Sequence, residues 1–214
     1  METIPNAALK EWAIVCKALK EGRQQILLRK GGIMEYRNGF ELKHNIFYLF
    51  PTFEHQSKEL IQPDYASNLD IIQQNTFLTD STKNKISSFA KVVFVREIND
   101  RTLVQKLEKY HIWNDRYVNI RMEYNPKKPM SVILLRVYKI NPPFEVNVKP
   151  EWKGCKSWIP ISFSDSDNNN SRLTNLDIDK DDNIDHPATV CNNKPTLDDS
   201  KFEQIAAEIE KILS

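Results

Sequence analysis

The clearest pattern in this chain is the alternation of side chains between two faces over residues 40–50. Six of them fall on one face, from Phe40 through His44 to Phe50, and the positions between them fall on the other face. A period of two residues is that of a β-strand. Pro51 is expected to end this strand, because a proline cannot donate a hydrogen bond to a neighbouring strand.

A second, shorter strand is predicted just upstream, over residues 24–29. Two glycine-containing pairs lie between the two strands, Gly31-Gly32 and Asn38-Gly39. Glycine and asparagine supply the positive φ angles that tight turns need. The whole segment is therefore predicted to fold as a hairpin.

Two other stretches repeat their apolar residues every three to four positions, which is the stripe of an amphipathic helix. The first covers residues 7–21 and ends at Gly22, a residue typical of helix C-termini. The second covers residues 199–214, where Ser200 and Glu203 match a capping box. We expect both helices to pack through their stripes.

The middle of the chain contains two strongly apolar segments, residues 89–98 and 130–140, which are predicted to be strands. Arg136 lies inside the second and must find a carboxylate, a ligand or the rim of a barrel, because an unpaired buried charge is very costly. Residues 62–87 are polar and weakly patterned, and a long loop is expected there. Residues 113–124 mix aromatic side chains with arginines and fit either a helix or a strand.

These elements predict an α+β fold with a small mixed sheet, followed by a tail of different composition. Residues 1–163 form the expected globular domain, residues 164–198 an acidic, Asn- and Asp-rich flexible linker, and residues 199–214 a C-terminal amphipathic helix. The length and the 40% hydrophobic content suffice for one sizeable core.

The net charge of +1 conceals a separation of charge along the chain. Residues 165–199 contain nine aspartates and three basic residues, a net of −6, whereas residues 1–164 carry +8. This asymmetry favours an anionic partner for the body, nucleic acid first. The acidic linker either competes with that partner or is only a solubilising spacer.

Several classes of protein are not supported by the sequence. No secretory signal and no apolar run near the roughly 18 residues of a membrane span occur, so a cytoplasmic protein is expected. Three scattered cysteines are too few for a disulfide framework or a zinc site. No complete metal or cofactor motif is found, and we predict neither a metal site nor a particular cofactor.

The polar residues around the predicted hairpin suggest a ligand cleft at the mouth of a small sheet. Arg29 and Lys30 would meet an anion, and a histidine would meet a base or a proton. A solvated strand end with one core histidine explains the same residues equally simply. The candidate ligand-binding residues are Arg29, Lys30, Thr52, His55, Gln56 and, from the aromatic and arginine-rich segment, Arg121.

A catalytic alternative rests on Glu41 and Lys43, which match the E-x-K half of a metal-dependent nuclease signature. The upstream acid is missing, because a two-residue turn at Asn38-Gly39 would place Glu35 and Glu41 on opposite faces. A bulge at Gly39 would repair this, or Glu11 or Glu21 would substitute. The catalytic candidates are Glu41, Lys43, Glu35 and His44.

The stretches EWAIVCKAL, GRQQILLRKGGI and FYLFPTFEHQ, followed by KKPMSVILLRVYKINPP and GCKSW, resemble the prokaryotic family catalogued as domain of unknown function 1802. The resemblance covers roughly residues 7–160 and implies no activity. The chain is also similar to ASCH and PUA-like barrels, in which a helix leads into a G-x-K-x-x-E-x-R pattern. Gly22 and Arg29 match its ends, whereas Gln24 and Leu27 replace its lysine and glutamate.

The similarity to ASCH and PUA-like barrels implies a PUA-like β-barrel with flanking helices that binds RNA or a modified base. The replacement of the lysine and glutamate of the pattern disfavours catalysis. The leading hypothesis is therefore a module that binds nucleic acid or a nucleotide. The alternatives are a metal-dependent nuclease of the E-x-K type and a non-catalytic protein whose C-terminal helix docks on a partner.

Overall fold

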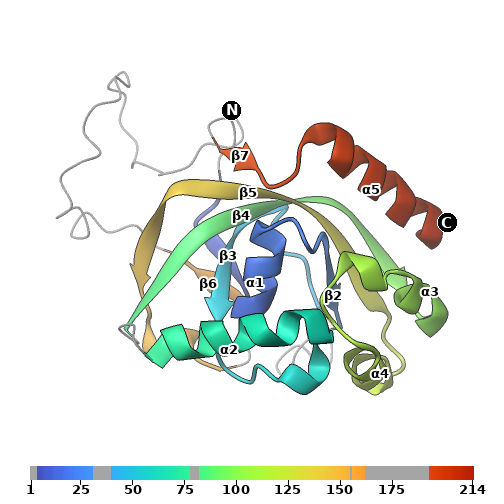
Figure 1. The fold of residues 1–214 in the computed structure, drawn as a ribbon, viewed down its shortest axis with the longest axis horizontal. Helices are drawn as coiled ribbons and strands as arrows, with labels where there is room; N and C mark the ends of the chain where they lie inside the picture. The colour runs from blue at the N-terminus through green and yellow to red at the C-terminus, as the bar shows by residue number, and fades with distance from the viewer. Residues whose placement is uncertain (1–3, 31–39, 78–81, 155, 162–192) are drawn as a thin grey trace.

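The centre of the molecule is a mixed β-sheet, seen in a computed structural model that describes residues 4–30, 40–77, 82–154, 156–161 and 193–214 (Figure 1). The strands of these residues run in the order β2-β5-β4-β3-β1-β6, and β7 pairs with β5. The predicted α+β fold with a small mixed sheet is confirmed. The strands are β1 (Ala7–Trp12), β2 (Ile26–Arg29), β3 (Ile46–Thr52), β4 (Lys83–Ile98), β5 (Met130–Asn147), β6 (Trp158–Pro160) and β7 (Lys194–Pro195).

Two long strands form the frame of the sheet. β4 and β5 pair antiparallel and curve over helix α1 (Figure 1). Their register shifts between Ile86 and Ser88 and again between Val92 and Phe94. Such bulges bend a strand and increase its twist, so the pair can wrap around the helix. The central strand predicted at residues 89–98 is confirmed, and it starts earlier, at Lys83.

The first predicted helix is half strand. Residues Ala7–Trp12 form β1, which pairs in parallel with β3 and antiparallel with β6, and α1 covers only Ala13–Lys20. Alanine, leucine, lysine and glutamate favour a helix locally, but pairing with two strands overrides that preference. The predicted end is correct: Gly22 has φ 70°, and the Arg23 N–H donates to the Ala18 carbonyl at 2.9 Å.

The predicted hairpin does not form. β2 pairs with β5, and β3 pairs with β1 and β4, so the two strands are not neighbours. β3 also begins later than predicted, at Ile46, and continues through Pro51 to Thr52. The proline is accommodated in the parallel pairing with β1, opposite Glu11. The two predicted turns at residues 31–32 and 38–39 lie outside the described residues.

Helices cover the ends of the sheet. Residues 62–87, predicted as a loop, instead contain α2 (Pro63–Phe77) and the start of β4. α2 has only a weak amphipathic pattern, and its fully buried Leu69 packs into the core. Asp100 caps α3 (Arg101–Lys106) by accepting from the Thr102 N–H at 2.7 Å. Residues 113–124, which fitted either a helix or a strand, contain the helix α4 (Asp115–Glu123). Short 3-10 turns complete this layer at Lys58–Leu60 (η2), Glu108–Tyr110 (η3) and Pro150–Trp152 (η4).

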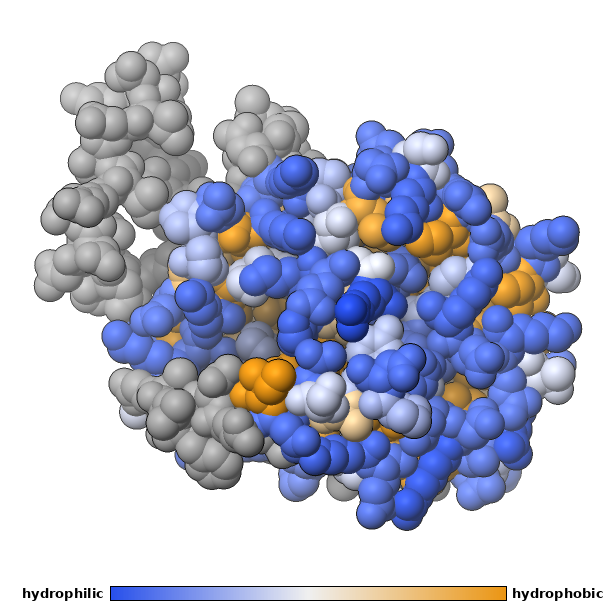
Figure 2. All heavy atoms as spheres, in the orientation of Figure 1, coloured by the Kyte–Doolittle hydropathy of each residue, from blue (hydrophilic) through white to orange (hydrophobic). Residues whose placement is uncertain are grey.

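The last helix, α5 (Asp199–Leu213), packs on the outside of the sheet. Its cap is Asp198, which accepts from the Lys201 N–H at 2.8 Å, and not the predicted Ser200. Arg136 finds its carboxylate here, because its Nη2 lies 2.5 Å from Asp199. The Phe202 ring lies 4.4 Å from the same guanidinium. Figure 2 shows apolar side chains beside the position of α5 on an otherwise largely hydrophilic face.

The buried apolar residues form two clusters. The larger cluster contains most of α1 and buried residues of the first half of β5, and the smaller contains Tyr48 and Phe89. Cys16 is a buried free thiol, while Cys155 and Cys191 lie outside the described residues. In the part of the chain that the structure describes, no helix is long and apolar enough to cross a membrane.

Candidate functional site

Polar and aromatic side chains converge where β1 ends and α1 begins. We call this group the junction site, and it consists of Glu11, Trp12, Arg29, Gln56, Tyr117 and Arg121. Burial raises the pKa of Tyr117, and the charges of Arg121, Glu11 and Arg29 also act on this pKa. The group therefore shares one partly buried environment, although its members come from β1, β2, α4 and the loop after β3.

Arg29 joins two separate parts of the sheet at this site. Its Nη2 donates to the Lys10 carbonyl at 2.7 Å and lies 2.8 Å from Glu11 Oε1. β2 and β1 are not neighbours in the sheet and share no backbone hydrogen bonds. The Arg29 side chain therefore links these two strands. Within the described residues, the buried Nε of Arg29 has no hydrogen-bond partner.

Glu11 is a buried carboxyl held between two guanidinium groups. Burial raises its pKa above the ordinary value, and the charges of Arg29 and Arg121 act in the opposite direction. A carboxyl in this position is costly to keep charged unless it has such partners. Its contact with Arg29 therefore fixes the orientation of that side chain.

Gln56 closes the start of α1 from outside the helix. Its Oε1 accepts from the Ile14 N–H at 3.1 Å, which satisfies one of the free donors at the helix start. Trp12, the N-cap residue, makes no side-chain cap of its own. The Nε2 of Gln56 is buried and has no partner among the described residues. Among the described residues, Arg29 and Gln56 thus each keep a buried nitrogen donor unused at the junction site.

Aromatic rings border these donors. Trp12 meets Trp113 edge-on with 5.0 Å between the ring centroids, and Trp113 stacks on Tyr117 at 3.8 Å. Trp113 is buried, whereas Trp12 and Tyr117 are half-buried. The Phe40 ring lies 5.3 Å from the Arg29 guanidinium. The site therefore combines guanidinium donors with ring faces at its edge.

The other predicted ligand residues have different surroundings. Lys30 is buried, and its ammonium donates to the Met122 carbonyl at 2.7 Å. Burial and the charge of Arg121 lower its pKa. Thr52 lies opposite Trp12 in the β1–β3 register, at the edge of the junction site. His55 is an exposed turn residue with φ 61°.

The E-x-K pair does not lie on a strand, as the nuclease hypothesis assumed. Glu41 and Lys43 are exposed on a segment that precedes β3. Phe40 at its start stacks on Trp158, with ring centroids 6.3 Å apart, and the Glu41 carbonyl accepts from Trp158 Nε1 at 2.9 Å. The alternating apolar residues of this segment therefore reflect packing against Trp158 and not membership of a strand.

The remaining catalytic candidates are Glu35 and His44. Glu35 lies outside the described residues. His44 borders a small apolar pocket of about 270 Å³, and its ring meets Trp158 edge-on at 5.2 Å. Across the described residues, no group of three or more His, Cys, Asp or Glu side chains could hold a metal ion.

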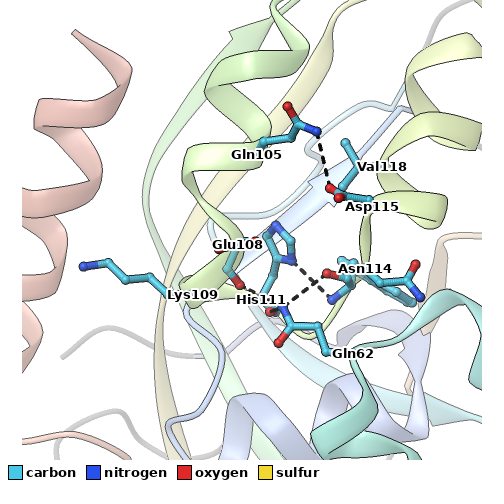
Figure 3. A pocket seen from close by; sticks show the side chains of 9 residues that line it. Gln62, Gln105, Glu108, Lys109, His111, Asn114, Asp115 and Val118 are labelled. Carbon is cyan, nitrogen blue, oxygen red and sulfur yellow. Dashed lines mark hydrogen bonds between the residues drawn. The ribbon is translucent and has the colours of Figure 1, made fainter.

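A larger pocket, of about 410 Å³, lies between α3, α4 and the start of α2, and we call it the α3–α4 pocket (Figure 3). Gln62 Nε2 donates to the carbonyls of Glu108, His111 and Trp113 at 3.0, 3.0 and 3.3 Å. Asn114 caps α4 through its Oδ1 and donates from Nδ2 to the Glu59 and Ile61 carbonyls. These amides connect the chain segments that form the wall.

His111 is also a structural part of this pocket. Its Nδ1 accepts from the Trp113 N–H at 3.2 Å, and burial lowers its pKa to about 4. The two carboxylates at the rim belong to Glu108 and Asp115, and Asp115 accepts from Gln105 at 3.4 Å (Figure 3). The lysine at the rim, Lys109, is paired with Glu208 at 2.7 Å. Acidic groups at the rim disfavour an anionic ligand.

Three residues of the junction site, Glu11, Trp12 and Tyr117, were not among the site residues predicted from the sequence. Glu11 entered only as a substitute acid for a nuclease, and Glu11 and Trp12 fell within the single helix predicted over residues 7–21. A pair of charged residues, Lys10 and Glu11, at the end of a buried strand was the available signal. The Lys10 ammonium donates to the carbonyls of Trp152 and Gly154 on one face, while Glu11 meets Arg29 on the other.

The chain is similar to solved structures of an ASCH protein. The ASCH protein of Zymomonas mobilis is 10% identical, with 75% of this chain and 89% of that chain covered and a TM-score of 0.43. Two mutants of that protein are 11% and 12% identical, cover 73% and 69% of this chain and 89% and 93% of theirs, and have TM-scores of 0.43 and 0.40.

No protein of curated function matches this chain significantly. A family model does match it, over residues 8–178, which is well over half of its length, and its description is "Domain of unknown function (DUF1802)". The resemblance seen in the sequence motifs is confirmed, and the chain belongs to the DUF1802 family.

Proposed function

We propose that this protein binds nucleic acid or a nucleotide at the junction site. One observation carries the proposal: the guanidinium of Arg29 is fixed by Glu11 and the Lys10 carbonyl, yet its buried Nε has no partner among the described residues. A buried donor without a partner costs about 1–3 kcal/mol, which a ligand oxygen would recover.

The chemistry of the surrounding groups suits such a ligand. Arginine is the preferred partner of phosphate, because its planar donors match two phosphate oxygens. Arg121 lies on the last turn of α4, half-buried and close enough to Glu11 to act on its pKa. The half-buried rings of Trp12 and Tyr117 offer faces on which a base can stack.

The charge of the body supports the same class of ligand. Residues 1–164 carry a net of +8, which attracts polyanions over a distance of about 8 Å at physiological ionic strength. Binding should weaken as salt rises, in proportion to the number of phosphates contacted.

Arg121 is the residue to change, because Arg29 and Glu11 also hold the sheet together. Binding of labelled single-stranded RNA and DNA is measured by fluorescence anisotropy across a salt series, for the original chain and for Arg121→Gln. We expect Arg121→Gln to weaken binding about tenfold, equivalent to about 1.4 kcal/mol, and to reduce the salt slope.

Lys201→Gln is the matched control, since it removes one exposed positive charge from α5, on the outside of the sheet. It should leave affinity nearly unchanged. Equal affinities for the original chain and Arg121→Gln, with both proteins folded, would remove the junction site from the account of binding.

A further inference from the structure

A second group of basic side chains gathers at the opposite end of α1. We call it the lysine cluster, and it consists of Lys20, Lys85, Lys139 and Lys194. Lys139 of β5 lies directly opposite Lys194 of β7 in the antiparallel register. Side chains paired in this way point to the same face with Cβ atoms about 5 Å apart. Both lysines are exposed.

The other two lysines come from α1 and β4. Lys20, in the last turn of α1, is half-buried, and its pKa is lowered by burial and then by the charges of Lys85, Lys139 and Lys17. Independent packing evidence places β7 at this end of the helix. A Cβ added to Gly22, just after α1, would lie 2.8 Å from Leu197 Cδ2, three residues after Lys194. Four elements therefore bring positive charge to one place.

The nearby acids compensate this charge only in part. Glu21 forms an ion pair with Lys17, its neighbour one turn earlier on α1. Glu145 lies opposite Lys85 in the β4–β5 register, but its carboxylate is 3.7 Å from Lys83. The structure shows no ion pair to Lys20, Lys139 or Lys194 within its described residues. Like charges placed directly opposite each other destabilise a sheet, so this arrangement is unfavourable for folding alone.

We propose that the lysine cluster binds the phosphates of a nucleic-acid strand whose nucleotide occupies the junction site. This inference rests on the function proposed above. α1 has eight residues, and its two ends are therefore about 12 Å apart along the helix axis. One oligonucleotide can contact both sites, with bases and one phosphate at the junction site and further phosphates at the lysines.

The test uses the full chain and the double variant Lys139→Gln/Lys194→Gln, which removes two exposed, facing charges and should not destabilise the fold. Binding of a labelled 20-nucleotide single strand and of a mononucleotide is measured across a salt series. We expect weaker binding of the oligonucleotide and a salt slope smaller by about 1.4, or about 0.7 for each phosphate contact. Mononucleotide affinity should not change.

The control is Lys201→Gln/Lys211→Gln, which removes two lysines from α5. An equal loss of slope in this control would show that net charge alone acts and would overturn the inference. If Arg121→Gln weakens oligonucleotide binding but the lysine variant keeps the original slope, the lysine cluster is not a site and the junction site stands. If the original chain binds neither ligand, both proposals are wrong.

Discussion

The junction site and the α3–α4 pocket differ in how their buried polar atoms are used. In the α3–α4 pocket, the Gln62 amide donates to three carbonyls and Asn114 caps a helix while holding two more carbonyls. At the junction site, Arg29 and Gln56 each make structural hydrogen bonds and still retain a buried donor without a partner among the described residues.

This difference shows why volume is a poor guide to function in this fold. The α3–α4 pocket is the larger hollow, at about 410 Å³, but its amides already stabilise the protein. Buried polar groups in native proteins are nearly always satisfied, so the exceptions are informative. Among the described residues, the pocket retains the Nε2 of His111 without a partner, whereas the junction site retains donors on a guanidinium group and an amide beside ring faces. The two regions should therefore respond differently to mutation: polar substitutions in the pocket should change stability alone, and those at the junction site should also change binding.

The largest effect is expected where the junction site also supports the fold. Arg29→Met leaves the buried Glu11 carboxyl without its nearest partner, and we expect a loss of about 3–5 kcal/mol in the free energy of unfolding. Adding Glu11→Leu should restore most of the stability but not the binding. Urea denaturation of the original chain, both single variants and the double variant gives the coupling energy. A coupling near zero would contradict the ion pair.

The next effect concerns the buried histidine of the α3–α4 pocket. The pKa of His111 is about 4 in the folded state and about 6.5 in an unfolded chain. Above pH 6.5 both states are neutral there. Below it the unfolded chain takes up the proton first, so stability falls until about pH 4, by up to about 3 kcal/mol. We expect His111→Asn to be less stable at pH 7 and to depend less on pH between 7 and 4.5. Parallel pH profiles of the two proteins would show that His111 titrates normally.

A smaller change distinguishes structural from binding amides. Gln62→Met removes the donor of three backbone carbonyls and should cost about 1–3 kcal/mol in stability. Oligonucleotide affinity, measured where the variant is fully folded, should stay within twofold of the original. A loss of affinity as large as that of Arg121→Gln would place the ligand in the α3–α4 pocket instead.

The smallest effect is expected from the acidic segment, which lies mostly outside the described residues. Competition with nucleic acid predicts that replacing its aspartates by asparagine tightens binding a few-fold at low salt and little at physiological salt. Asp198 and Asp199 must be kept, because they cap α5 and pair with Arg136. The substitutions are therefore Asp165, Asp167, Asp177, Asp179, Asp181, Asp182 and Asp185 to Asn. Unchanged affinity at the lowest salt would make the segment a spacer.

Local sequence patterns correctly predicted the elements that are recognisable from their own residues. The strands at residues 89–98 and 130–140 were predicted from their apolar runs, and the last helix was predicted from its apolar stripe. Arg136 was expected to need a carboxylate and has one in Asp199. In each case the deciding interaction is between neighbours or follows directly from burial.

Features that depend on distant pairing were missed. Residues 7–12 consist of good helix formers, and only pairing with β3, about 40 residues away, makes them a strand. β5 and β4 lie between β2 and β3 in the sheet, so the predicted hairpin does not form. The junction site was predicted in part, through Arg29, Gln56 and Arg121. Glu11 could not be placed beside Arg29 as long as it was assigned to a helix.

Ultraviolet crosslinking of a bound single-stranded oligonucleotide, followed by mass spectrometry of the peptides, compares the two regions most directly. The reaction joins bases to side chains that they contact, aromatic ones among them. We predict crosslinks to Trp12, Tyr117 or Phe40, all of which are lost in Arg121→Gln. Crosslinks confined to Glu108, Lys109 or His111 in the lining of the α3–α4 pocket (Figure 3), or crosslinks at the junction site that persist unchanged in that variant, would contradict the proposed site.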